Sequence, residues 1–144
     1  MDLSDTQTRM TTRTYAGRYD NLAEIATFVR QEANLAGLSF KDVFEVETAV
    51  DEAVSNIIEH AYAGEGIGDV TVTCLPEPNG IRIILEDHGI PFDPACVPLP
   101  DTHAQLKKRK EHGLGYFFLC QLMDEVKFEF EKNVNRLTLF KNKS

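Results

Sequence analysis

The sequence is poor in cysteine, and it contains neither a long apolar run nor a signal-peptide core. Its three cysteines, Cys74, Cys96 and Cys120, lie far apart and form no C-x-x-C pair. This pattern excludes a disulfide framework and indicates a reducing compartment, in which each cysteine is expected to be a small core residue. Because no apolar segment reaches membrane-spanning length and the first ten residues are polar, we expect a cytoplasmic protein that does not enter a membrane.

Basic residues are also few relative to acidic ones. The chain carries 15 Lys and Arg against 23 Asp and Glu, so its formal net charge is −8. This acidity argues against a nucleic-acid or anionic-membrane partner, and it is compatible with a basic protein partner, although solubility alone would explain it. A length of 144 residues with 42% hydrophobic residues fits a single domain with a real core. We place this domain at residues 9–144, behind a flexible tail at 1–8.

Hydrophobic periodicity and turn residues divide the chain into helices and strands. The expected strands are 10–15, 70–74, 81–85, 126–130 and 137–140, and the expected helices are 21–36, 40–62 and 113–123. The segment 92–112 lacks periodicity, which predicts a long functional loop or lid. Because strands and helices do not alternate regularly, we expect an α+β fold, a two-layer α/β sandwich. Its mixed, mostly antiparallel sheet of about five strands should carry the three main helices on one face.

The expected helix 40–62 carries polar groups that a core helix does not need. At about 100° per residue, Glu52, Asn56 and His60 lie on one stripe, beside an apolar stripe. A carboxylate can accept a proton from an attacking group, and an amide oxygen can ligate a hard cation such as Mg²⁺. Taken alone, the stripe is better explained as the solvated face of the helix.

Two further motifs follow downstream. The motif Asp87-x-Gly89 ends a strand, and the motif Gly113-x-Gly115 opens a helix after a basic run at 107–110. Alone, the first motif is a common turn, the second is a tight corner, and a basic run is usually a solvated face. Because both motifs follow the polar helix stripe in this order, we interpret the stripe and the two motifs as parts of one site.

Together, the three motifs fit a purine nucleoside triphosphate. Asp87 can accept a hydrogen bond from the adenine amine, and Gly89 lets the backbone approach the ring closely. The backbone amides of 113–115 form a phosphate cradle at the start of a helix. Either Arg109 or Lys110 can reach a terminal phosphate.

The helix stripe supplies the remaining chemistry. Asn56 can hold Mg²⁺, which keeps several waters and shares the phosphates of a substrate. Glu52 lies one helical turn away, where it can accept a proton from an attacking hydroxyl. The residues therefore predict a site for a nucleotide with Mg²⁺.

The order E-x-x-x-N, D-x-G-x-P-F-D-P and G-x-G before a helix resembles the Bergerat-fold (GHKL) ATPases, whose unit is a histidine-kinase-like ATPase domain. It is most similar to the anti-sigma-factor serine/threonine kinases of the RsbW type, over nearly the whole chain. The resemblance implies ATP and Mg²⁺ as cofactors and a STAS-type anti-sigma antagonist as the phosphorylated protein. It also implies a sigma factor as the partner in the other state, and the apolar helix faces are compatible with a homodimer.

The same resemblance implies a role for each motif residue. Glu52 is the catalytic carboxylate, Asn56 the Mg²⁺ ligand and Asp87 the adenine reader. Residues 92–112 correspond to the ATP lid. The other nucleotide-binding positions are His60, Gly89, Pro91, Arg109, Lys110, Gly113, Leu114 and Gly115.

Two positions depart from the family pattern. Glu111 stands where an arginine often precedes the lid glycines, so a residue of the basic run would have to contact the γ-phosphate. Asn135-Arg136 lies near the start of the last strand, where relatives often have Gly-Thr. Thr138 would supply the missing hydroxyl only if the register slipped by two residues.

Alternative functions follow from these departures. The change at Glu111 favours an ATP-gated binding module that sequesters a regulator with little or no kinase activity. The detached catalytic domain of a sensor histidine kinase is a third reading, although the chain has no helix pair with a phosphoacceptor histidine and its lid is short. An α+β domain without a nucleotide would need three motifs to coincide by chance.

Overall fold

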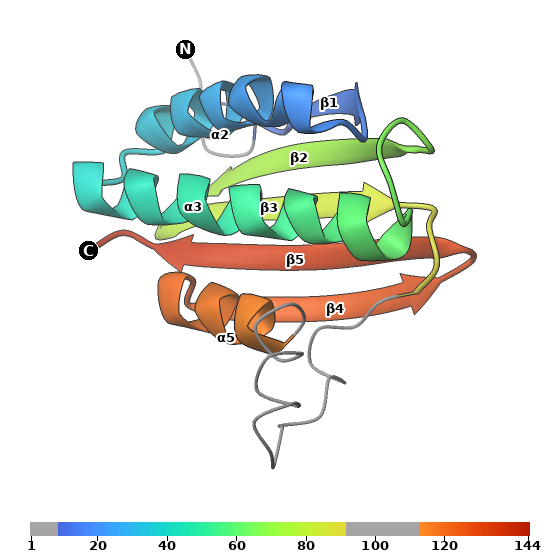
Figure 1. Cartoon of the computed structure of the whole chain (residues 1–144). Helices are drawn as coiled ribbons and strands as arrows, with labels where there is room; N and C mark the ends of the chain where they lie inside the picture. The colour runs from blue at the N-terminus through green and yellow to red at the C-terminus, as the bar shows by residue number, and fades with distance from the viewer. Residues whose placement is uncertain (1–8, 92–112) are drawn as a thin grey trace.

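The computed structural model describes residues 9–91 and 113–144 of the chain, which Figure 1 colours from blue to red. In chain order the elements are β1 (Thr11–Ala16), the 3-10 turn η1 (Tyr19–Asn21), α2 (Leu22–Leu35), α3 (Phe40–Asn56), η2 (Ile57–Ala61), β2 (Asp69–Glu77), β3 (Gly80–Asp87), α5 (Gly113–Leu122), β4 (Glu125–Glu131) and β5 (Val134–Asn142). Apart from η1 and η2, this order confirms the predicted one. The expected tail at 1–8 and the expected lid at 92–112 lie outside the described residues.

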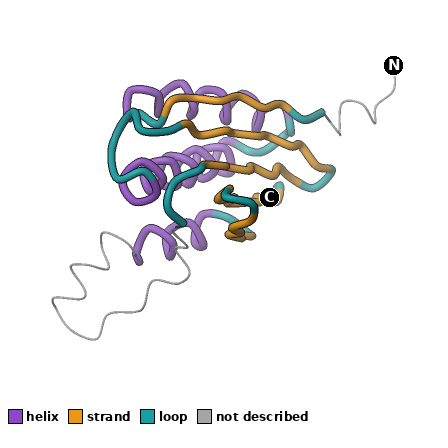
Figure 2. Tube along the Cα trace, turned by 90° about the vertical axis from the view of Figure 1, so that its right-hand side faces the viewer, coloured by secondary structure: helices purple, strands orange, loops and turns teal. Residues whose placement is uncertain are grey.

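The five strands form one sheet in the order β1-β2-β3-β5-β4, and all four pairings are antiparallel. The expected mixed sheet therefore has no parallel pair among the described strands. Two-residue turns join β2 to β3 and β4 to β5, and such short turns permit only antiparallel pairing. Helices α2, α3 and α5 cover one face of the sheet in Figure 1, and Figure 2 shows them to one side of the strands. The α+β two-layer sandwich is confirmed.

The core lies between this helical layer and the sheet. Alternate side chains of β2 and β3 point to the helical face, as the period of a strand requires. The fully buried members of these two strands are Val70, Val72, Cys74, Ile81, Ile83 and Leu85. They form one cluster with apolar residues of α2 and α3, such as Phe28, Val46 and Val50. No helix within 9–91 or 113–144 has both the length and the apolarity that crossing a membrane requires.

The cysteines differ in their burial. Cys74 is fully buried in β2, and this burial raises the pKa of its thiol to about 12. The thiol therefore stays protonated near neutral pH, and we expect it to be unreactive. Cys120 is exposed on α5, and the prediction of a core residue is wrong there. The adjacent Leu119 is fully buried and occupies the face that meets the core. Cys96 lies outside the described residues.

The start of α3 is fixed by local chemistry. Ser39 caps the helix, because its hydroxyl oxygen accepts a hydrogen bond from the Asp42 amide at 3.2 Å. Just before it, Gly37 adopts a φ of 88° after the end of α2, a left-handed conformation that favours glycine. The short connection sets α3 beside α2 on the sheet.

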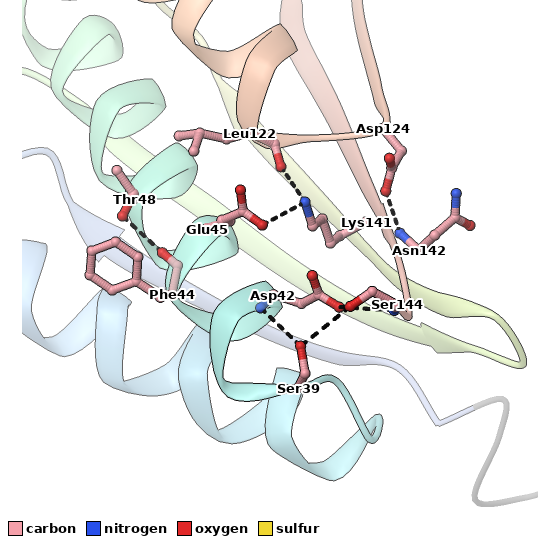
Figure 3. A network of polar contacts seen from close by, with 10 residues as sticks. All are labelled: Ser39, Asp42, Phe44, Glu45, Thr48, Leu122, Asp124, Lys141, Asn142 and Ser144. Carbon is pink, nitrogen blue, oxygen red and sulfur yellow. Dashed lines mark hydrogen bonds and ion pairs between the residues drawn. The ribbon is translucent and has the colours of Figure 1, made fainter.

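A polar network ties the end of β5 to α3 and α5, as Figure 3 shows. Lys141 Nζ donates a hydrogen bond to the Leu122 carbonyl at 2.7 Å and lies 3.1 Å from Glu45 Oε1. The Asn142 amide donates to Asp124 Oδ2 at 2.6 Å. These contacts hold the last turn of α5 against β5 and α3, and they help to set the position of the whole helix.

Candidate functional site

The helix predicted at 40–62 is two segments, so the prediction of one continuous helix is wrong. The α-helix ends at Asn56, and Ile57–Ala61 form the π-helical segment η2. The Tyr62 amide donates to the Ile57 carbonyl at 3.0 Å, five residues back. A π turn is wider than an α turn, so the angular positions of an ideal α-helix do not hold beyond Asn56. Such turns are frequent at functional sites.

The start of α5 lies directly against the polar stripe of α3. A Cβ atom added to Gly115 would lie 2.8 Å from Glu52 Oε1 and 3.1 Å from Asn56 Nδ2. A side chain at this position would turn one of these flexible groups aside, so glycine lets the start of α5 lie against both of them. The fold therefore brings together the helix stripe and the glycine motif, which are far apart in the sequence.

Glu52 is half-buried at this contact, and burial raises the pKa of its carboxyl group. The negative charges of Glu59 and Asp51 raise this pKa further, whereas His60 lowers it. The His60 side chain is 15% exposed, and its Nε2 lies 3.8 Å from Glu59 Oε2. A raised pKa makes Glu52 a stronger base, which suits a group that takes a proton from a hydroxyl.

Asp87 ends β3 and is buried, with 3% of its surface exposed. Its Oδ1 accepts hydrogen bonds from the Gly89 amide and from Asn135 Nδ2, each at 2.8 Å. Burial raises the pKa of Asp87, although these two hydrogen bonds act in the opposite direction. The carboxylate is held in one orientation and keeps acceptor capacity on its second oxygen.

The strand register identifies the residue that supports Asp87. The pairing of β3 with β5 sets Asn135 opposite Asp87, and it sets Thr138 opposite Ile84. The register therefore does not slip by two residues, so Thr138 does not lie where its hydroxyl could help Asp87. An amide takes the place of the hydroxyl that the resemblance suggested.

Gly89 packs against the end of η2. A Cβ atom added to it would lie 2.4 Å from the Ala61 carbonyl oxygen, and the Ile90 amide donates to the same oxygen at 2.8 Å. The Tyr62 hydroxyl adds a second link, because it accepts a hydrogen bond from the His88 amide at 3.0 Å. The loop after β3 is thus fixed to the π turn, a role for Tyr62 that the sequence did not indicate.

A small cavity joins the helix stripe to the Asp87 cluster. Its volume is about 30 Å³, which holds a water molecule but not a purine base. A base would therefore have to widen it. The lining residues are Ala53, Asn56, Ile57, Ala61, Asp87, Phe128, Asn135 and Leu137. The sequence predicts Phe128 and Leu137 only as strand residues, since apolar alternation does not distinguish a pocket wall from the core.

The other predicted site residues divide into two groups. Pro91 is exposed, and Gly113 and Leu114 begin α5. The basic residues Arg109 and Lys110 lie outside the described part of the chain. Their contact with a phosphate therefore stays a prediction.

The side chains suit a cation that arrives with a nucleotide. Within the described residues, no group of three or more His, Cys, Asp or Glu could hold a metal ion. Mg²⁺ that is shared with phosphates needs only one or two protein ligands, because it keeps several waters. Asn56 is buried, with 8% of the residue exposed, and its carboxamide faces the start of α5, so it fits this role.

Comparison with known proteins defines the class. Residues 15–141 match the histidine kinase-like ATPase domain, so the chain belongs to this family. A solved structure of the RsbU and RsbW domains of Rv1364c from Mycobacterium tuberculosis has the same fold, with a TM-score of 0.64. The match covers 94% of this chain and 32% of that chain, at 18% identity.

Within this class, the chain is similar to proteins named serine-protein kinase RsbW. It is 30% identical to the one from Listeria monocytogenes over 107 residues, which are 72% of this chain and 68% of that protein. It is 28% identical to one from Bacillus cereus over 109 residues, which are 73% and 68% of the two chains. These relatives confirm the resemblance inferred from the motifs.

Proposed function

We propose that the chain is an ATP-binding anti-sigma factor and serine/threonine kinase in a partner-switching system. It phosphorylates a STAS-type anti-sigma antagonist, and in its other state it sequesters a sigma factor. The contact of Gly115 with Glu52 and Asn56 carries the proposal, because it sets a carboxylate and a carboxamide at a helix start. Similarity to proteins named serine-protein kinase RsbW supports a protein as the acceptor. A cytoplasmic location and a homodimer, both expected from the sequence, belong to the same proposal.

The two halves of the site suit the two ends of ATP. Asp87, supported by Asn135, accepts a hydrogen bond from the adenine amine. The amides at the start of α5 bind phosphate oxygens, and Arg109 or Lys110 contacts the terminal phosphate. Asn56 would hold Mg²⁺, which would neutralise phosphate charge when it is bound.

Glu52 takes the proton in the transfer step. The serine or threonine hydroxyl oxygen bonds to the γ-phosphorus while the bond to the β-phosphate oxygen breaks, and Glu52 accepts the hydroxyl proton. The products are the phosphorylated protein and ADP. The raised pKa of Glu52 and its position against Gly115 both support this role.

A second candidate function is an ATP-gated binding module with little or no kinase activity. Glu111 favours it, because an acidic residue stands where a phosphate-binding arginine is expected. In this case the affinity for the partner depends on the nucleotide state, while no phosphoprotein forms.

A label-transfer experiment separates these functions. The purified chain is incubated with γ-labelled MgATP and a lysate of the source organism, and nucleotide binding is measured by calorimetry in parallel. We expect label on a small protein, and only when the chain is added. Nucleotide binding without any labelled protein would favour the gated module, and an absence of nucleotide binding would contradict both functions.

Replacing Gly115 with alanine should lower the transfer rate roughly 10–100-fold, the scale of a small misplacement of reacting groups. The added methyl group meets the ends of two flexible side chains rather than backbone. Glu52 or Asn56 would therefore turn away while the fold is kept. Steady-state rates and thermal melting measure the two effects, and Cys120→Ala, an exposed site on the same helix, is the control. An unchanged rate in Gly115→Ala would argue against a reacting site at this contact.

A further inference from the structure

We infer that Tyr62 is a positioning residue of the nucleotide site, which holds the loop 88–91 at a fixed distance from Asn56. The inference rests on the proposed nucleotide binding, and it adds the group that couples the phosphate end of the site to its base end. Tyr62 comes directly after η2 and is not among the residues proposed to contact the nucleotide. It acts through the loop and through the π turn.

Three successive amides of the loop after β3 are each held by a different acceptor. The His88 amide donates to the Tyr62 hydroxyl oxygen at 3.0 Å, and the Gly89 amide donates at 2.8 Å to the carboxylate that ends β3. The Ile90 amide donates to the Ala61 carbonyl at 2.8 Å. Two of the three acceptors therefore belong to the end of η2, which Figure 1 shows beside this loop.

The Tyr62 hydroxyl is bound on two sides. Besides accepting from the His88 amide, it donates to the Asp69 carbonyl at the start of β2, at 2.6 Å. A Cβ atom added to Gly68 would lie 2.3 Å from the Tyr62 ring, so the ring lies directly against the backbone there. Burial raises the pKa of Tyr62, and the hydroxyl therefore keeps the proton that it donates. It forms a fixed bridge from β2 to the loop.

The π turn connects this bridge to the residue proposed to hold Mg²⁺. Asn56 ends α3 and immediately precedes η2, and the Tyr62 amide donates to the Ile57 carbonyl at 3.0 Å. Tyr62 thus closes the turn through its backbone and holds the loop through its side chain. A nucleotide that contacts both Asn56 and Asp87 needs these two residues at one fixed spacing, and the turn with Tyr62 sets it.

The energetic consequence follows from the population of the anchored loop. Without the Tyr62 hydroxyl, the His88 amide loses its acceptor, and the anchored conformation loses about one hydrogen bond of stability. The apparent affinity for a ligand falls in proportion to the population of the conformation that binds it. The loss should therefore appear in the binding of the nucleotide and not in the chemical step.

Two variants test the inference. Tyr62→Phe removes the hydroxyl alone, and Gly68→Ala pushes the Tyr62 ring out of its place. The control is Tyr19→Phe, which removes a hydroxyl that donates to Glu59 at 3.0 Å. Calorimetry should show the Kd of MgATP raised roughly 3–10-fold in both variants and unchanged in the control. The kcat of label transfer at saturating MgATP should stay within about twofold, because the proposed reacting groups precede the turn.

An unchanged Kd in Tyr62→Phe would overturn the inference, even with a lowered melting temperature, because a merely structural tyrosine affects stability alone. If Tyr62→Phe does not fold, Gly68→Ala is judged by the same criterion. A kcat that falls as much as the Kd rises would also overturn it, since the hydroxyl would then act on the reacting groups.

Hydrogen exchange of the wild-type chain decides the matter if neither variant folds. Coupling is reciprocal, so MgATP should slow exchange of the His88 and Ile90 amides more than that of the Lys143 amide. The Lys143 amide donates to the Asn79 carbonyl at the other end of β3. Equal slowing at all three amides would contradict the inference. A wild-type chain that binds no MgATP would instead contradict the proposed function, a result distinct from an unchanged Kd in Tyr62→Phe.

Discussion

Replacing Glu52 with glutamine should lower the rate of phosphoryl transfer by roughly 10²–10⁴-fold, the usual contribution of a general base. Glutamine keeps the size and polarity of the side chain that faces Gly115, but it cannot accept the proton. The affinity for MgATP should stay within about threefold, since the residues proposed to bind the nucleotide are unchanged. Initial rates of label transfer and calorimetric titration of MgATP measure these two quantities separately.

The neighbouring Asp51 provides a matched control. Asp51 is exposed, and its negative charge contributes to the raised pKa of Glu52. Asp51→Asn removes this charge and should lower the pKa of Glu52, so the acidic limb of the pH–rate profile should move to lower pH. Turnover that is unchanged in Glu52→Gln would exclude Glu52 as the proton acceptor. A limb that moves to higher pH in Asp51→Asn would show that another group titrates.

The features that can be predicted from the sequence are those that neighbouring residues determine. Ser39 caps α3 through the Asp42 amide three residues on, and a capping serine before a periodic segment is visible in the sequence. The alternation of Val70, Val72 and Cys74 likewise marks a strand with one buried face. Glu52 can be singled out in the sequence for a related reason, because it lies on a polar stripe of its helix that runs beside an apolar stripe.

The features that cannot be predicted depend on contacts between distant segments. Asn135 supports Asp87 because of the register between β3 and β5, and burial of a whole strand face fixes such a register. The π turn after Asn56 is joined to the Ile90 amide through the Ala61 carbonyl, and that amide belongs to a loop after β3. Neither contact has a counterpart in the local pattern of residues.

We expect the contact of the glycine motif with α3 to depend also on the polar contacts of Lys141 at the opposite end of α5. Methionine in place of Lys141 should lower the free energy of unfolding by about 2–4 kcal/mol, because it leaves a mostly buried carboxylate and a carbonyl without their donor. The carboxylate belongs to Glu45, whose side chain is 21% exposed, and the carbonyl belongs to Leu122. Since Glu45 can turn toward water, the loss should be smaller than for a fully buried pair. Urea unfolding measures it.

Lys127→Met is the matched control for this loss. Lys127 is 70% exposed and lies 3.8 Å from Glu129, and such a surface pair contributes less than about 1 kcal/mol. Hydrogen exchange then tests whether the anchor acts on α5 itself. In Lys141→Met, the amides of α5 should exchange faster relative to those of α2, because Lys141 binds the last turn of α5 and makes no such bond to α2. Equal acceleration in both helices would mean that Lys141 stabilises the domain as a whole and does not position the helix that brings Gly115 to Glu52.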